Sequence, residues 1–152
     1  MSKEKLHKGI LLQTDVVNKN GRIYPRHIFM KELERYKKEH IKNGSAFGEL
    51  DHPSSNVVSV SNVSHIITDT YFKFPKVPRK KKKKMKKQGT YNYDTVFVKY
   101  KLLTTEEGKL AKQFIDNLVP SPRGIGSVDA NGVVNDDYQL ISIDLIRKET
   151  KS

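Results

Sequence analysis

The order of apolar and polar positions along the chain predicts several strands and two helices. Four segments are rich in β-branched and aromatic residues, mostly in alternation with polar ones, which is typical of strands. They are Lys8–Val17, Asn62–Phe74, Thr90–Leu103 and Asp136–Ile146. A further short strand with an Asn-Gly hairpin turn at Asn131 and Gly132 is predicted just before the last of them.

Two segments have helical spacing instead. Over His27–Ile41, apolar residues recur every three or four positions among Lys and Glu, and the pattern ends at the turn residues Asn43 and Gly44. Over Thr104–Leu118, a Thr-x-x-Glu capping signal precedes an apolar stripe of Leu110, Phe114 and Leu118. Both segments are therefore predicted to be amphipathic helices that pack on a sheet.

These elements indicate the α+β class. Strands outnumber helices, no internal repeat is visible, and 152 residues make about one domain. We expect one domain over residues 1–152, with a curled, antiparallel, barrel-like sheet that carries two main helices.

Charge changes this picture at one place. The segment Arg79–Lys87 contributes eight positive charges to a net charge of +12, so the rest of the chain carries only +4. Like charges at this density repel one another, which predicts a flexible, solvated loop at about residues 76–89, at the tip of a hairpin. A solvated insertion is the plain interpretation. The alternatives are an anionic partner, either nucleic acid or an acidic protein, or a nuclear-import signal.

Composition excludes some chemistry. The chain has no cysteine, which excludes disulfides, thiolate metal sites and a cysteine nucleophile. No apolar run approaches the roughly 20 residues of a membrane span, and the first residues lack the apolar core of a signal peptide. We expect no cofactor, no metal, no membrane contact and a protein that stays in the compartment where it is made.

The sequence GELDHPSS, from Gly48 to Ser55, contains the most informative histidine. His52 is either a turn residue without a chemical task or a general base. A metal site formed by Glu49, Asp51 and His52 is a sharper alternative, but no His-x-x-x-His or comparable ligand spacing supports it. His65 lies in a strand pattern, and we interpret it as a core or surface histidine with its hydrogen bonds satisfied.

The segment Val119–Val128 combines prolines, glycines, serines and an arginine between a helix and a strand. A turn of this kind can leave backbone N–H groups unpaired and directed into a pocket, as an oxyanion hole requires. Ser121 would lie at its mouth. Ser127 is a second hydroxyl, expected to fall in the following strand, and is the alternative nucleophile.

Three motifs together resemble a known family. LLQTDVVNKNGRIYPRHIF, FGELDHP and SPRGIGSV occur in the order and at the separations seen in the prohead core protein proteases of T-even-type tailed phages. The resemblance covers Gly9 to Ile146. It implies a fold similar to the herpesvirus protease assemblin and a serine endopeptidase of capsid maturation. Such an enzyme would cleave scaffold and capsid precursors within an immature viral capsid inside the host cell. Self-processing and homo-oligomerisation stay open.

Carried over to this chain, the resemblance makes His52 the catalytic base and Ser121 the nucleophile. In the assemblin-like fold the third member follows the nucleophile on a strand, which points to Asp144; Glu49 is the second choice. An acid within so apolar a strand needs a partner to offset its desolvation, and the His52 ring could supply it.

One position departs from the family pattern. Pro122 stands where the family has a second serine, and proline has no N–H to donate. An oxyanion hole would then use the N–H groups of Arg123 and Gly124, and the Arg123 side chain could orient a loop or bind a water. Pro122 and the lysine-rich segment favour an alternative function, that of an inactive protease-fold scaffold or a nucleic-acid-associated capsid component.

Overall fold

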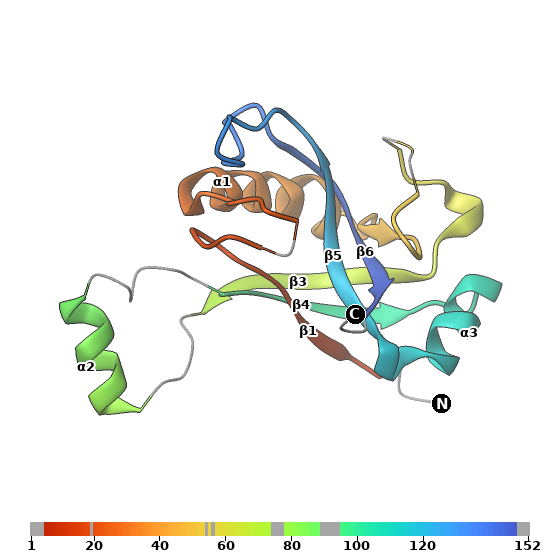
Figure 1. Ribbon diagram of the computed structural model, residues 1–152. Helices are drawn as coiled ribbons and strands as arrows, with labels where there is room; N and C mark the ends of the chain where they lie inside the picture. The colour runs from red at the N-terminus through yellow and green to blue at the C-terminus, as the bar shows by residue number, and fades with distance from the viewer. Residues whose placement is uncertain are drawn as a thin grey trace.

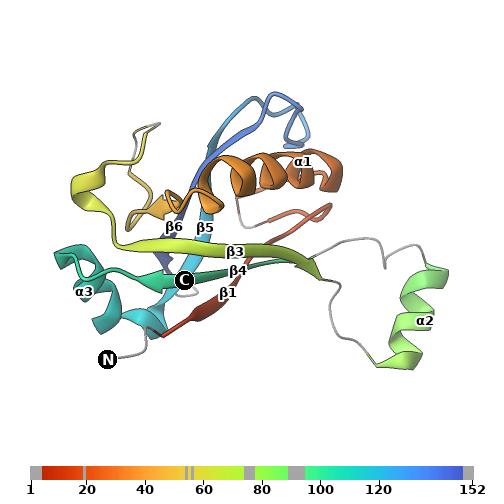
Figure 2. The same cartoon turned by 180° about the vertical axis from the view of Figure 1, so that it is seen from behind.

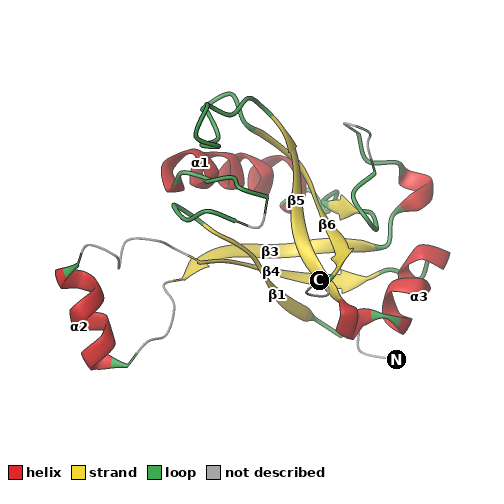
Figure 3. Cartoon of the chain, viewed as in Figure 1, coloured by secondary structure: helices red, strands yellow, loops and turns green. Residues whose placement is uncertain are grey.

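A computed structural model describes residues 5–18, 20–53, 55, 57–73, 78–88 and 95–148. Its larger sheet has the strand order β1-β4-β3-β2, and all of its neighbouring strands are antiparallel. These strands are β1 (His7–Gln13), β2 (Phe47–Gly48), β3 (His65–Lys73) and β4 (Thr95–Leu102). A second, antiparallel pair consists of β5 (Leu118–Ile125) and β6 (Gln139–Arg147). Figures 1 and 3 show the arrangement.

The β5–β6 pair crosses one face of the larger sheet, and the two together form a curled antiparallel half-barrel (Figure 1). The strands cross closely: a Cβ on Gly9 of β1 would lie 2.9 Å from the Pro120 ring of β5. The opposite face of β1, β4 and β3 carries no helix or strand among the described residues (Figure 2). The predicted α+β class with a curled, barrel-like antiparallel sheet is confirmed.

The first predicted helix is present with nearly the expected bounds. Helix α1 (Arg26–Tyr36) continues as a π-helical turn (Lys37–Ile41) and ends at Lys42. Its apolar stripe enters the core that β1, β4 and β6 also line. Phe29, Leu33 and Tyr36 are almost completely buried. Burial of this stripe, rather than helix propensity alone, holds such a segment in place.

The second predicted helix is shorter than expected, and it packs on the fold through a different face. Helix α3 (Glu106–Gln113) begins at Thr105, whose hydroxyl accepts from the Gly108 N–H as the capping signal predicts. The predicted apolar stripe is wrong, because Leu110 and Phe114 are 48% and 51% exposed. The helix instead packs through Gly108 and Ala111, since a Cβ at Gly108 would lie 2.0 Å from the Leu103 carbonyl oxygen. Short 3-10 turns, Val60–Asn62 and Ile115–Asn117, complete the helical elements.

The lysine-rich segment is helical, so the prediction of a loop is wrong for Arg79–Lys87, which forms α2. The hairpin prediction is confirmed, because β3 and β4 pair antiparallel and α2 lies beyond their far ends (Figures 1 and 2). None of the α2 side chains is buried. Residues 74–77 and 89–94, which include the start of the predicted strand Thr90–Leu103 and parts of the predicted loop, lie outside the described residues.

The segment around Ser121 also differs from its prediction. The segment forms the strand β5 and not a turn. The strand begins at Leu118, which was predicted to end the second helix. The sequence pattern did not predict this strand because it contains prolines at positions 120 and 122, and proline is rare in central strands. The Asn-Gly turn is confirmed: Gly132 has φ +83° and donates its N–H to the Asp129 carbonyl at 3.1 Å.

No helix in the described parts of the chain has the length and apolar character of a membrane span.

Candidate active site

His52 sits in a strained turn against β6. Leu50 bridges to Leu145, and the Asp51 N–H donates to the Leu145 carbonyl at 2.9 Å. Asp51 and His52 both have positive φ, 61° and 47°, although neither is glycine. Each such residue costs on the order of 1–3 kcal/mol and persists only where its surroundings fix it, as at many functional sites. Pro53 follows and restricts the exit from the turn.

The structure joins three predicted side chains in one hydrogen-bonded series. His52 Nδ1 lies 2.8 Å from Asp144 Oδ2, and His52 Nε2 lies 2.8 Å from Ser121 Oγ. Ser121 and Asp144 are direct cross-strand partners of β5 and β6, so the strand register places them on opposite sides of one imidazole. With an ionised Asp144, Nδ1–H donates to the carboxylate, and Nε2 is left to accept the serine proton.

Asp144 is completely buried, and its carboxylate is fully engaged. Oδ1 accepts from the Glu49 N–H at 2.9 Å and from the Ser142 hydroxyl at 3.0 Å. Burial by itself would raise the pKa of Asp144. The hydrogen bonds from His52 and the Glu49 backbone, together with the Arg123 charge, outweigh burial and hold this pKa below its ordinary value. The carboxylate is therefore ionised at neutral pH.

Arg123 is the buried cation behind the carboxylate. Its Nη2 lies 2.8 Å from Glu49 Oε2 and its Nε lies 3.0 Å from Asp144 Oδ2. Its Nη1 donates to the carbonyls of Pro53 and Ser55, at 3.3 and 3.0 Å, which are the residues that follow His52. One guanidinium therefore ties the His52 turn to both buried acids, in a geometry that its fixed fork of donors suits.

Other candidates from the sequence lie elsewhere. His65 is completely buried, with Nδ1 2.7 Å from Ser64 Oγ and Nε2 2.7 Å from the Ile143 carbonyl, which confirms its interpretation as a satisfied core histidine. Burial lowers its pKa. Ser127 is exposed, lies outside the strands, and accepts a hydrogen bond from the Asn135 amide. Its predicted place in a strand is wrong.

The three residues considered as metal ligands, Glu49, Asp51 and His52, each have a different partner. Glu49 pairs with Arg123, whereas Asp51 is exposed and approaches Arg147 at 3.8 Å. Within the described ranges, no three acidic or histidine side chains form a group that could hold a metal ion. The sequence predicts Glu49 only as a metal ligand or as the second-choice partner of His52, and it does not predict the pairing of Glu49 with Arg123. A signal existed, because a lone Arg and a lone Glu in apolar segments each need an opposite charge.

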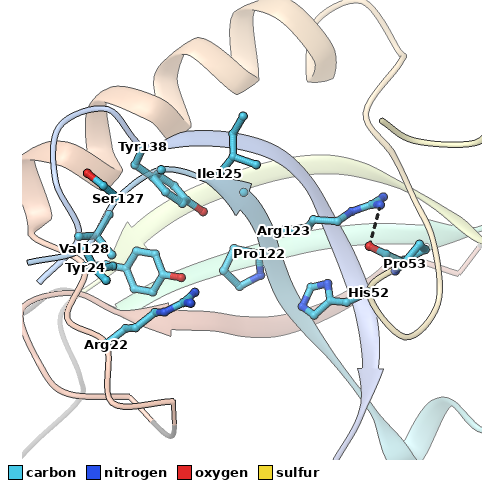
Figure 4. A pocket seen from close by; sticks show the side chains of 13 residues that line it. Arg22, Tyr24, His52, Pro53, Pro122, Arg123, Ile125, Ser127, Val128 and Tyr138 are labelled. Atoms are coloured by element: carbon cyan, nitrogen blue, oxygen red, sulfur yellow. Dashed lines mark hydrogen bonds between the residues drawn. The ribbon is translucent and has the colours of Figure 1, made fainter. Parts of the chain in front are cut away.

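A pocket of about 230 Å³ opens beside His52 (Figure 4). Its lining includes Pro122, Gly124, the start of the loop after β5, Arg22 and Tyr24. Figure 4 shows the His52 ring and the Pro122 ring at one end of this pocket and Tyr138 on its far side. Space next to the reacting groups is what a substrate side chain would need.

Pro122 does not remove a backbone hydrogen bond between β5 and β6. It lies opposite Ile143, whose carbonyl accepts from His65 Nε2 and so points away from β5. Because backbone groups alternate sides along a strand, the Pro122 nitrogen faces the open edge of β5 rather than β6. Proline is tolerated at such an edge. The residue directly after Ser121 therefore has no N–H to donate at that edge.

A serine, a histidine and a buried acid hydrogen-bonded in series are the arrangement of the serine hydrolases. The sequence comparison is more specific: residues 3–147 match the prohead core protein serine protease family, and the chain belongs to that family.

Two relatives illustrate the match. The chain is 28% identical over 149 residues to the prohead core protein protease of Enterobacteria phage T4, covering 91% of this chain and 61% of the relative. It therefore spans less than two thirds of that relative's length. The fold is similar to the solved structure of the bacteriophage T4 capsid assembly protease, gp21, with a TM-score of 0.73 and 27% identity. That match covers 95% of this chain and 82% of the other.

Proposed function

We propose that this chain is a serine endopeptidase of viral capsid maturation, with Ser121 as nucleophile, His52 as base and Asp144 as the acid that orients the base. The observation that carries the proposal is the pair of 2.8 Å contacts at the two nitrogens of His52. Ser121 would attack the scissile carbonyl as Nε2 accepts its proton, and the imidazolium would then protonate the leaving amine. The ionised Asp144 would stabilise the imidazolium.

The oxyanion would be bound at the open edge of β5, next to Ser121. Gly124 lies opposite Leu140, whose carbonyl accepts from Arg35 and whose N–H donates to Glu32, both away from β5. By the same alternation, the Gly124 N–H faces the open edge and the pocket. Arg123 lies opposite Ser142 across a hydrogen-bonding position, so its N–H faces β6. We therefore assign the backbone donor to Gly124 and a positioning task to the Arg123 side chain.

The substrates would be scaffold and capsid precursor proteins of the same virus, cleaved inside the immature capsid in the host cell, with the chain itself as a further substrate. Membership of the prohead protease family and the names of the T4 relatives support this assignment. An anionic partner for α2 and a homo-oligomeric state belong to the same proposal. Pro122 is the observation that favours the alternative, an inactive scaffold with the protease fold, because it removes one N–H beside the nucleophile.

Cleavage of a precursor distinguishes the two. The purified protein is incubated with the scaffold protein of its own virus, and new termini are identified by mass spectrometry. The proposal predicts new termini with the native protein and none with Ser121→Ala. An inactive scaffold would leave the precursor intact in both samples.

A further inference from the structure

The most highly charged surface of the molecule lies away from the candidate active site. Helix α2 carries eight cations in nine residues, none of them buried, and stands beyond the ends of β3 and β4 (Figure 2). The triad lies on β5, β6 and the turn before Pro53. None of the three triad residues lies on α2, so the triad does not explain the charge of this helix.

The charges of α2 surround its whole axis. Successive residues of an α-helix are about 100° apart, and the sequence RKKKKKMKK contains Met85 as its one apolar residue. Peripheral membrane helices need an apolar face, and protein interfaces are depleted in Lys. The helix therefore lacks the features of one that inserts into a membrane or packs on an ordinary protein surface. A polyanion fits it on every side.

The spacing of the charges favours one polyanion. An α-helix rises about 1.5 Å per residue, so α2 presents one positive charge per ~1.7 Å of its axis. Duplex DNA presents one negative charge per ~1.7 Å of its own axis. An extended acidic peptide rises about 3.3 Å per residue and reaches at most half that charge density. The match favours the duplex.

Like charges at helical spacing repel one another within α2. Arg79 and Lys83, Lys80 and Lys84, and Lys83 and Lys87 are like-charged pairs four residues apart, which destabilise a helix. No acidic residue lies in its first turn, and no side chain caps it. Phosphates along the helix would relieve this repulsion and favour the helical form.

A second group of cations lies on the uncovered face of the larger sheet (Figure 2). Lys8 and Lys99 are direct cross-strand partners there, an unfavourable pairing of like charges. Their ammonium groups lie 5.9 and 5.7 Å from the Tyr71 ring centroid. Asp69, opposite Lys99, is ion-paired with Lys37 at 3.3 Å. Lys8 and Lys99 therefore give this face of β1, β4 and β3 a net positive charge.

We propose that α2, with Lys8 and Lys99, is a binding surface for duplex nucleic acid, which it holds through the phosphate backbone without reading the base sequence. Lysine is a point-charge ligand for phosphate, and α2 contains no aromatic residue to stack on a base. The surface would hold the protein on nucleic acid while leaving the pocket beside His52 open.

The test measures fluorescence anisotropy of a labelled duplex of about 20 base pairs between about 50 and 200 mM salt. The α2 variant replaces Lys80, Lys81, Lys83 and Lys84 with Gln, a good helix former. The matched control replaces four exposed lysines elsewhere, Lys31, Lys38, Lys42 and Lys112, and so has the same net charge. Thermal unfolding verifies that both variants fold.

The native protein and the control should bind with a steep salt dependence. The slope of log affinity against log salt should be shallower by about 3.6 in the α2 variant, at about 0.9 per lost phosphate contact. Equal losses in the two variants, or a native affinity indifferent to salt, would overturn the proposal. Polyglutamate that displaces the duplex as well as unlabelled duplex does, at equal charge, would assign the surface to an acidic protein instead. Precursor cleavage is unaffected by any of these outcomes, so the two proposals fail separately.

Discussion

At the scale of residues, the site depends on three buried charges around one imidazole. Glu49 and Asp144 supply two negative charges and Arg123 one positive charge, all at most 8% exposed. The remaining negative charge faces His52, which is where the proposed proton transfer from Ser121 would form a positive imidazolium. Arg123 offsets the other charge and fixes the turn after His52. Buried charges of this kind are retained only in pairs.

Replacement of Ser121 by Ala should lower precursor cleavage by several orders of magnitude. The fold should be unaffected, because the side chain is partly exposed and the hydrogen bond recorded for its hydroxyl is the one to His52. Ser127→Ala, six positions further along the chain, is the control and should cleave at the native rate. If Ser121→Ala stays active and Ser127→Ala does not, the nucleophile is Ser127 and not Ser121.

Asp144→Asn should fold and lose about two to four orders of magnitude in turnover, because the amide favours the wrong His52 tautomer. It should also be less stable by roughly 1–3 kcal/mol, since several hydrogen bonds to a charged group are weakened. Asp51→Asn is the control: Asp51 adjoins His52 in sequence, but its carboxylate is exposed and lies near Arg147. Steady-state kinetics and urea unfolding measure both effects. Equal rates in the two variants would exclude Asp144 from the triad.

The lowered pKa of Asp144 has a consequence for acid stability. A carboxyl whose pKa is lower in the folded than in the unfolded chain stabilises the fold above its unfolded pKa. This contribution is lost as pH falls through the folded value, which lies below the ordinary 3.8. The difference in unfolding free energy between the native protein and Asp144→Asn should therefore be present at about pH 5 and shrink as the pH falls below it. A difference that does not change with pH would contradict the pairing.

Single residues of the site were predictable where motifs surround them. The resemblance carried by the GELDHP and SPRG motifs points to His52 and Ser121. It also points to Asp144, because it places the third member on the strand after the nucleophile, and the cost of an unpaired acid in that apolar strand supports the choice. The sequence could not show that Arg123 turns its side chain toward Glu49 rather than toward the oxyanion. That orientation depends on the register of β5 with β6, which places Ser142 opposite Arg123.

At the scale of elements, α2 lies outside the packed core of the fold. Its side chains contribute nothing to the core, and it follows a hairpin that β3 and β4 form by themselves. The sequence predicted a loop there because eight like charges oppose a helix, and the charge pattern gave no apolar face on which a helix could be recognised. The same reasoning missed the packing of α3, which contacts its neighbours through small residues.

Deletion of Lys80–Lys87 should change the free energy of unfolding by no more than about 0.5 kcal/mol, because no buried contact is lost. Thermal and urea unfolding of the shortened protein measure this. Replacement of Phe29, which is completely buried in α1, by Ala is the contrasting variant and should cost about 3–5 kcal/mol. A deletion as damaging as Phe29→Ala would make α2 part of the folding unit.

At the scale of the whole molecule, the half-barrel brings together residues that are far apart in the chain. His52 and Ser121 are 69 positions apart, and His52 and Asp144 are 92 apart. The strand and helix pattern predicted the α+β class, but periodicity carries no information on which strands pair. The crossing of the β5–β6 pair over the larger sheet, with Gly9 against Pro120, could be anticipated only from the family resemblance.

Covalent labelling can test whether Ser121 is a nucleophile activated by His52. The protein is treated with a fluorophosphonate, a reagent that phosphonylates activated serines, and the modified residue is mapped by mass spectrometry. We expect one adduct on Ser121, with labelling lost in His52→Ala and retained in Ser127→Ala. An adduct on another serine, or equal labelling of Ser121 in the absence of His52, would contradict it.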